Sequence, residues 1–417
     1  MTSTGFSVPL LIVLAMLNGL TPFSIDMYLS AFPEMAVEFG TTASGVQLSL
    51  TAFLIGLASG QLVIGTVSDR YGRRVPLLVG TAACLVASLA CAVAPSIAVL
   101  VALRFVQGFT GAAGVVIGRA VIADRVEGAA AARVFAVMML ISVLAPITAP
   151  MLGGGIVTWL GWRAVFVALA VLNLLLLFGV LAFVEESLPP ERRRPGGLGA
   201  LAASARSVLT NRHYLGYALT MAFTSGGLFA YISASPFVLQ NIIGLSPGRY
   251  AVTFGCCALC IGVSGLVSAR LVRRFPPRRV LIGGVCGMVV MASLLLLAVT
   301  AGGVQPVATI GLMAGFLASI GFVYSNATAL ATTEVRHAAG TGSAVLGLLQ
   351  YGTGAVTPPL VGLAGSASAV PMGVVMGGAA ALAALSLAVL TRGHRPDFEP
   401  VPVEAAEPAG FRGGGSG

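Results

Sequence analysis

Long apolar stretches recur along nearly the whole chain, and short polar connectors separate them. Twelve stretches can be traced, with starting points near Val8, Gly45, Val75, Ile97, Val134, Ala164, Tyr214, Arg249, Val280, Val304, Ala339 and Ala369. Each can supply the ~20 mostly apolar residues that a transmembrane helix needs. The runs are continuous and do not alternate, which excludes a transmembrane β-barrel. The pattern predicts an all-α membrane protein with twelve transmembrane helices.

Composition supports this class and excludes several others. Hydrophobic residues make up 57% of the chain and charged residues 9%, against ~25% charged in soluble domains. This excludes a soluble globular protein, a disordered chain and a nucleic-acid binder. The six cysteines all lie inside apolar runs, which argues against a disulfide-stapled domain, and we interpret them as packing residues.

Arginine placement predicts the orientation of the helices. Arginines cluster in the connectors after every second apolar segment and in the C-terminal tail, and the opposite connectors hold only Arg163 and Arg249. Positive residues stay on the cytoplasmic side of a membrane. We therefore expect both termini to be cytoplasmic. The first apolar run lacks a basic leader and a cleavage site, so it is expected to be retained as the first span.

A proline- and arginine-rich segment divides the chain near its midpoint. We expect an N-terminal six-helix half over 1–184, a cytoplasmic linker over 185–213, a C-terminal six-helix half over 214–392 and a disordered tail over 393–417. An internal repeat supports this division, because the sequence from Gly65 to Arg70 recurs as Gly265 to Arg270 between the second and third spans of each half. Duplicated halves indicate a secondary transporter with its substrate site between them.

Several motifs carry a family resemblance. Gly65-x-x-x-Asp69-Arg70-x-Gly72-Arg73-Arg74 and Arg104-Phe-Val-Gln107-Gly108 resemble the signatures of loop 2–3 and span 4 of the major facilitator superfamily. Ala145-Pro146-x-x-Ala149-Pro150-x-x-Gly153-Gly154 is similar to the span 5 motif of its antiporters, with alanine where the first glycine is usual. Ser24-Ile-Asp26-Met-Tyr28-Leu and the segment from Glu185 to Arg193 resemble the bicyclomycin-resistance (Bcr/CflA) type of multidrug–proton antiporter.

One acidic residue, Asp26, lies within a predicted span, and an ionisable residue inside a membrane indicates a functional site. Arg104 is predicted to lie at a similar depth, since both residues are six positions below the outer end of their spans and so ~9 Å deep. We interpret the two as the proton-coupling residues, on whose protonation burial and charge act in opposite directions. The alternatives are a carboxylate at the outer water interface and a static buried ion pair.

The loop and span 5 motifs are the candidates for gating. The resemblance implies that Asp69 docks at the N-terminus of span 11 and closes the inner gate; the alternative is that these charges only set the topology. The prolines of span 5 should bend it, and its small residues should permit close packing. The gating candidates are Gly65, Asp69, Arg70, Gly72, Arg73, Arg74, Pro146, Pro150, Gly153 and Gly154.

Polar and aromatic residues within the spans are candidates for a substrate cavity that accepts weakly polar molecules. Each can equally serve in packing between helices. The candidates are Asn18, Tyr28, Gln107, Phe229, Tyr231, Phe322, Asn326, Gln350 and Tyr351. His213, His337 and His394 lie at loop ends or in the tail, so we expect no metal site. We also expect no cofactor, since without any lysine the chain has no nucleotide-binding loop.

Together these features predict a monomeric exporter in the bacterial inner membrane that exchanges protons for small, mostly apolar antibiotics of the chloramphenicol or bicyclomycin kind. A proton-coupled symporter of a nutrient or metabolite with the same fold is the alternative, and the span 5 motif argues against it. A polytopic membrane enzyme is a second alternative, but no cluster of catalytic groups at an interface supports one.

Overall fold

The computed structural model describes residues 7–126, 128–193, 206, 208–301, 303–335, 338–363, 365 and 367–393, and all regular structure in these ranges is helical. Most of the predicted tail, 394–417, lies outside the described residues, as does part of the predicted linker. The long helices are α1 (Val8–Asp26), α3 (Ala43–Tyr71), α4 (Arg74–Ala92), α5 (Ile97–Arg125), α6 (Gly128–Leu160), α7 (Trp162–Phe183), α9 (Arg212–Pro236), α10 (Pro247–Leu271), α11 (Pro277–Ala301), α12 (Pro306–Glu334), α13 (Ala339–Gly362) and α14 (Val370–Leu390).

Short elements continue some of the long helices. After α1 come the 3-10 turn η1 (Leu29–Ala31) and helix α2 (Phe32–Glu38), and α9 runs into the π-helical turn η3 (Phe237–Ile242). The turn η2 (Pro190–Arg192) follows α7. Over the described ranges, ten helical segments are long and apolar enough to cross a membrane, and α6 adds the apolar stretch Leu144–Leu160. The prediction of an all-α membrane protein with twelve long helices is confirmed.

Polar residues in the connectors set where the helices begin and end. The side chains of Ser7, Thr42 and Ser96 each accept a hydrogen bond from the backbone N–H three residues later, at the first turns of α1, α3 and α5. Such caps satisfy donors that have no partner within the helix. Helix α3 ends at Gly72, whose φ of 96° lies in the left-handed region that favours glycine. The glycine of the loop motif thus terminates α3 directly before α4.

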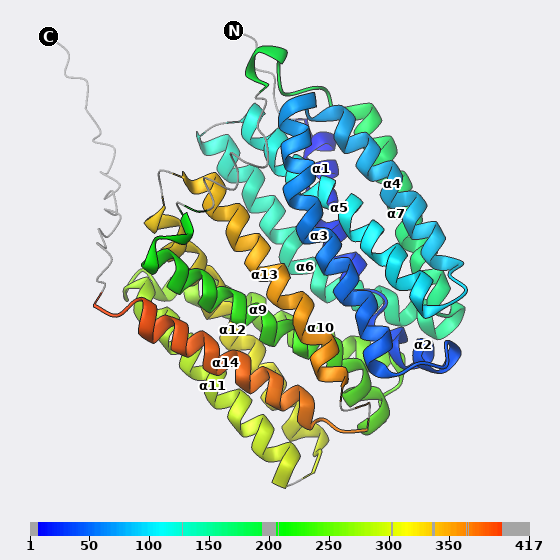
Figure 1. Ribbon diagram of the computed structural model, residues 1–417, viewed down its shortest axis with the longest axis vertical. Coiled ribbons are helices and arrows are strands. Elements are labelled where there is room, and N and C mark those ends of the chain that lie inside the picture. The colour runs from blue at the N-terminus through cyan, green and yellow to red at the C-terminus, as the bar shows by residue number, and fades with distance from the viewer. Residues whose placement is uncertain are drawn as a thin grey trace, which may run out of the picture.

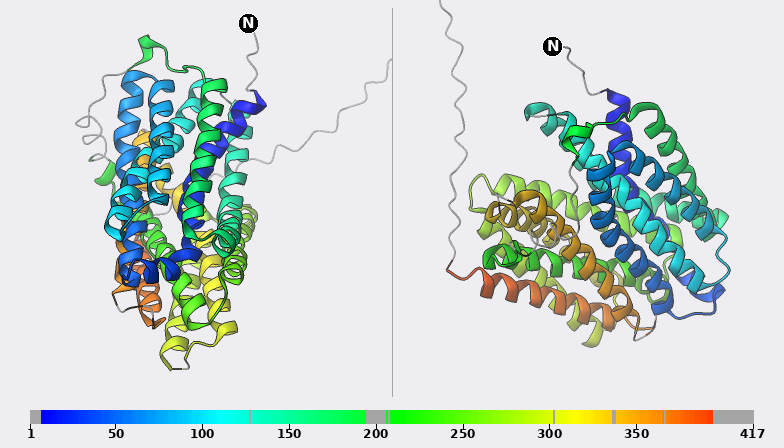
Figure 2. Two further views of the ribbon diagram at one scale, coloured as in Figure 1. Left: turned by 90° about the vertical axis from the view of Figure 1, so that its right-hand side faces the viewer. Right: turned by 45° about the horizontal axis from the view of Figure 1, so that its top comes forward.

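The helices form two groups, one from α1 to α7 and the other from α9 to α14 (Figure 1). In the right-hand view of Figure 2 most of the first group lies to one side of the second, and the groups pack against each other where α3 meets α13 and α6 meets α10. They meet at the ends of the helices around α2, where Gln47 Nε2 donates to the carbonyl of Ser233 at 2.9 Å and Gln240 Nε2 donates to the carbonyl of Ser30 at 3.1 Å. From there they diverge toward the side where α1 begins and α14 ends.

Glycines permit α3 and α5 to pack with their backbones in contact. A methyl group at Gly108 of α5 would overlap the backbone carbonyl of Phe53, and one at Gly56 of α3 would overlap that of Phe105. Small residues at such crossings allow close van der Waals packing in membranes, where the hydrophobic effect does not drive helices together. This contact fixes α5, which carries Arg104, against α3.

This packing generates a prediction about stability. Gly108→Ala should lower the free energy of unfolding by about 1–3 kcal/mol, the usual effect of overpacking a tight interior. Gly111→Ala is the matched control, because its added methyl would lie 3.6 Å from Cys84 Sγ, an ordinary contact, and its effect should stay within about 0.5 kcal/mol. Thermal unfolding of the purified variants in detergent measures both. Equal midpoints for the two variants would contradict the packing account.

Candidate functional site

Asp26 is the last residue of α1 and is buried inside the protein. Only 4% of the residue is exposed, and its Oδ1 atom is buried without a hydrogen-bond partner among the described residues. Leaving such an oxygen unsatisfied is unfavourable, all the more so where lipid surrounds the protein. In this conformation the carboxyl group therefore faces protein and is largely shielded from water.

The neighbours of Asp26 belong to the second group of helices. It interacts electrostatically with the hydroxyls of Tyr231 in α9 and Tyr250 in α10, which are both fully buried. Tyr231 Oη forms no hydrogen bond to an oxygen or nitrogen atom of the described residues and interacts with the Cys257 thiol, whereas Tyr250 Oη lies 3.3 Å from Ser235 Oγ. Phe254 stacks on Tyr231 with the ring centroids 5.4 Å apart. An aromatic wall that carries two hydroxyls thus faces the carboxyl group across the junction of the two groups.

Arg104 is fully buried within the first group. Its guanidinium donates to the carbonyl oxygen of Ser24 at 2.9 Å and to Gln107 Oε1 at 2.5 Å. The rings of Tyr28 and Phe53 each lie 4.3 Å from its central carbon. Aromatic faces attract a cation, and more strongly when water is excluded. Two of the substrate candidates, Tyr28 and Gln107, therefore hold Arg104 in place.

Asp26 and Arg104 lie at the same level but do not form an ion pair. Arg104 contacts the backbone of Ser24, two residues before Asp26, which agrees with the predicted depth. The ion pairs among the described residues are Arg73–Asp69, Arg73–Asp124, Arg125–Glu185 and Arg163–Glu38. The Asp26 carboxyl group therefore has no cationic partner in this state, and the joint role of the two residues in proton coupling stays a prediction.

The loop between α3 and α4 is held by a network of charges. Arg73 Nη1 donates to Asp69 Oδ1 at 2.6 Å, and Arg73 Nε donates to Asp124 Oδ2 at 3.1 Å. Glu186, after α7, accepts hydrogen bonds from the backbone N–H groups of Arg73 and Arg74 at 2.8 and 3.2 Å. A carboxylate at this position also interacts favourably with the N-terminal end of the α4 dipole.

The same contacts set the pKa of Glu186. Partial burial acts to raise it, but the backbone donors of Arg73, Leu188 and Arg74 and the charge of Arg193 outweigh burial and hold the pKa below its ordinary value. Because this pKa is lowered, the ionised Glu186 side chain stabilises the fold at every pH above the ordinary pKa of a glutamate. This contribution is lost as the pH falls through the lowered pKa.

Among the described residues, no hydrogen bond or ion pair joins Asp69 to α13 in this conformation. Half of its side chain is exposed, and it pairs with Arg73. Helices α3 and α13 run antiparallel, with Thr51 donating to the carbonyl of Ala355 at 2.8 Å and Gly347 lying against Gln61 further along. Continuing this register past Gln61 places Asp69 opposite the first residues of α13. The predicted docking position is thus in line with Asp69, and the docking itself stays a prediction.

The small residues of the span 5 motif lie where α6 meets the end of α1 and the second group. A methyl group at Gly153 would overlap the carbonyl oxygen of Met27, the residue after Asp26. Gly154 packs against Ala251 of α10. Helix α6 continues through Pro146 and Pro150, so the prolines do not end it. The small residues of the motif therefore allow α6 to pack closely against the end of α1, which carries Asp26.

The other gating candidates lie in the last two turns of α3 and at the first residue of α4. Gly65 faces Val116 of α5 at an ordinary packing distance, and Arg70 is exposed with its guanidinium over the Tyr71 ring. Arg74 Nη2 donates to the carbonyl of Leu181 at 3.2 Å.

The substrate candidates do not form a single cluster in the structure, and several of them lie at contacts between helices of the second group. Phe229 of α9 packs against Gly354 of α13. The structure directs Phe322 and Asn326 toward α11 and α10, because Phe322 packs on Gly284 and Asn326 Nδ2 donates to Ser268 Oγ at 2.7 Å. These two side chains lie within the second group and are separate from the surroundings of Asp26.

Arg119 of α5 is a further candidate that the sequence reasoning missed. It is exposed, and its Nη2 donates to Asn18 Oδ1 at 3.4 Å. It also interacts electrostatically with Tyr351 of α13, and the neighbouring Gln350 is partly buried. Arg119 thus links a candidate from each group of helices. The rule that identified Asp26, a charge inside an apolar span, would have found it.

The comparisons with known proteins agree with this architecture. The model of the Major Facilitator Superfamily matches residues 14–358. The chain is 39% identical over 384 residues to the uncharacterized MFS-type transporter YdgK of Bacillus subtilis, covering 91% of this chain and 94% of that protein. It is 31% identical over 387 residues to a bicyclomycin resistance protein homolog of Haemophilus influenzae, covering 91% and 96%. Multidrug resistance protein MdtL of Salmonella heidelberg is 28% identical over 335 residues, covering 79% and 82%.

Solved structures show the same fold at low sequence identity. An inward-facing, unoccupied bacterial homolog of the lysosomal transporter Spinster aligns with a TM-score of 0.76 at 16% identity, covering 93% of this chain and 97% of that one. A D-xylose-proton symporter aligns with a TM-score of 0.70 at 17% identity, covering 92% and 98%. Fold, motifs and relatives lead to one assignment: the chain belongs to the major facilitator superfamily and is a multi-pass membrane transporter of small molecules.

Proposed function

We propose that this transporter exports small antibiotics across the bacterial inner membrane in exchange for protons. The observation that carries the proposal is the buried Asp26 carboxyl group, which lacks a cationic partner and faces the second group of helices. Relatives named for bicyclomycin and multidrug resistance support antibiotics as the cargo class. The antiporter-like motif of α6 packs on the residue after Asp26, which supports exchange over symport.

Proton transfer at Asp26 would alter the contact between the two groups. A neutral carboxyl group fits a site without a counter-ion, whereas a carboxylate needs a donor, and the Tyr231 hydroxyl on the opposite group, which has only the Cys257 thiol beside it, can supply one. Loading or losing the proton therefore favours different arrangements of the two groups. One proton moving inward supplies ~2.3 kcal/mol per 100 mV of membrane potential.

The loop after α3 would act as the opposite gate. In this structure the groups are apart on the arginine-rich side, and Asp69 pairs with Arg73. When the groups close on that side, Asp69 meets the N-terminus of α13, a contact worth ~0.3–1 kcal/mol. Such a weak contact can form and break in each transport cycle.

The cargo would contact polar groups of both halves between Asp26 and this gate. Hydrogen-bond donors from both groups lie close to one another here. The first group contributes Arg119 and Asn18, and the second contributes Tyr351 and Gln350. A cargo molecule with a hydrogen-bond-accepting oxygen on an otherwise apolar frame fits this set. Small antibiotics with amide or carbonyl groups meet the description.

The first prediction concerns proton coupling. Asp26→Asn should abolish uptake of chloramphenicol or bicyclomycin driven by a pH gradient into inside-out proteoliposomes, because the amide cannot exchange a proton. Glu34→Gln, which removes an exposed acid eight residues later, should retain the wild-type rate. Gradient-driven transport by Asp26→Asn at the wild-type rate refutes the proposal. Cargo moving in the same direction as protons in the wild type indicates symport.

A second prediction concerns the contact of α6 with α1. Gly153→Ala should reduce drug export at least about 10-fold, the effect of a displacement costing ~1.4 kcal/mol, because its methyl group must displace Met27 and with it Asp26. Gly155→Ala meets open space and should transport normally. Initial rates from the same proteoliposomes, normalised to inserted protein, compare the two. Equal rates would show that the contact has no part in transport.

A third prediction concerns cargo affinity. Arg119→Gln should raise the KM for export about 10-fold with a smaller change in kcat, since a hydrogen bond to a charged donor contributes ~1.5–3 kcal/mol. Arg119→Lys keeps the charge and should recover part of the affinity. Rates over a range of drug concentrations provide both constants. An unchanged KM in Arg119→Gln excludes contact with that cargo.

A further inference from the structure

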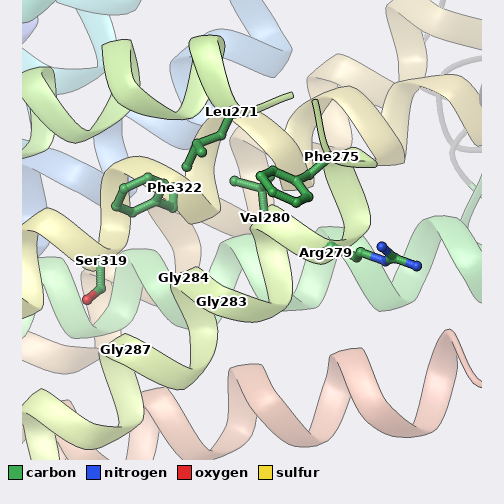
Figure 3. Close-up of a pocket in the computed structure, with 9 residues that line it drawn as sticks. All are labelled: Leu271, Phe275, Arg279, Val280, Gly283, Gly284, Gly287, Ser319 and Phe322. Atoms are coloured by element: carbon green, nitrogen blue, oxygen red, sulfur yellow. The ribbon is translucent and has the colours of Figure 1, made fainter. Parts of the chain in front are cut away.

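A cavity lies on the second group of helices, among α10, α11 and α12 (Figure 3). Its volume is about 490 Å³. Leu271, Phe275 and Phe322 provide apolar walls, and Gly283 and Gly287 of α11 leave the space open along one side. The cavity is separate from the surroundings of Asp26 and Arg119, and the transport mechanism does not use it.

The position of the cavity relates it to the bilayer. The helices that form it also carry exposed apolar residues, with Leu266 of α10 at 66% exposed and Ile282 of α11 at 40%. Its lining runs along α11 from Arg279, in the first turn, to Gly287. The eight steps from Arg279 to Gly287 span ~12 Å at 1.5 Å per residue, close to one leaflet of a ~30 Å hydrocarbon core. The cavity thus extends from one membrane surface to near the mid-plane.

Positive charge surrounds the membrane-surface end of the cavity. The connector from α10 to α11 and its flanks carry five arginines and no acid: Arg270, Arg273, Arg274, Arg278 and Arg279. Arg278 donates to the carbonyl of Thr391 at 3.1 Å. For the exposed Arg279 side chain, no hydrogen bond or ion pair is found among the described residues, and Figure 3 shows it at the rim of the cavity. Its guanidinium is available to a ligand.

We propose that this cavity binds one acyl chain of an anionic phospholipid, with the lipid phosphate on Arg279. An apolar hollow of one-leaflet depth accommodates a hydrocarbon chain, and an arginine guanidinium binds a phosphate with two parallel hydrogen bonds. Basic pockets between transmembrane helices on the positively charged side are suited to such headgroups. The bound chain lies against the junction of α11 and α12, where Gly284 packs on Phe322.

Filling the cavity tests the acyl-chain site. A side chain at Gly283 has open space around its first carbon, so Gly283→Leu extends into the cavity without displacing the backbone. Gly378→Leu on α14 adds the same side chain, also into open space, and is the control. Native mass spectrometry of protein titrated with phosphatidylglycerol should show one tightly bound lipid for the wild type and the control, and about 10-fold weaker binding for Gly283→Leu, ~1.4 kcal/mol.

Removing the rim charge tests the headgroup contact and does not depend on the folding of Gly283→Leu. Arg279→Gln should lose the preference for phosphatidylglycerol over phosphatidylethanolamine with the same chains. Arg249→Gln, at the opposite end of α10, should keep it. Glycerol phosphate without acyl chains should not compete. Wild-type lipid binding by both Gly283→Leu and Arg279→Gln overturns the proposal, as does full competition by glycerol phosphate or displacement of the lipid by the transported antibiotic.

Discussion

Arg104 is held inside the first group of helices by partners that carry no negative charge. A carbonyl oxygen, an amide oxygen and two aromatic faces occupy its guanidinium. These contacts offset part of the cost of burying the charge, although Arg104 Nε has no hydrogen-bond partner among the described residues. Because these partners lie on the same side of the molecule as Arg104, Asp26 keeps no cation of its own and is directed at the second group. The proposed chemistry of the transporter depends on this separation of two opposite charges at one depth.

Sequence patterns predicted the helices well because lipid imposes a simple rule. A chain crossing the bilayer must satisfy its backbone hydrogen bonds internally, so twelve apolar stretches predict twelve helices, and the structure contains them. The loop and span motifs led to the family that the comparisons show. The predicted equivalence of the two halves and the cytoplasmic position of the termini stay predictions, since they depend on symmetry and on a membrane.

Side-chain environments were less accessible to prediction. Phe322 and Asn326 share a helix face, but periodicity does not tell which neighbouring helix that face meets, and here it meets α10 and α11. Arg119 lies inside α5, but it is only six residues before the arginine that ends that helix, so it also resembles a topology signal. The opposite charges of Asp26 and Arg104 suggested that the two side chains share a cavity. In the structure the Arg104 guanidinium instead contacts aromatic rings and a carbonyl oxygen. Each of these outcomes depends on contacts between segments distant in sequence.

The carboxylate of Glu186 joins the connector after α7 to the first turn of α4. The segment that follows α7 and leads to the second group of helices is therefore attached to the first group, beside the loop that follows Asp69. Acidification would neutralise this carboxylate and so weaken the attachment of that segment to α4.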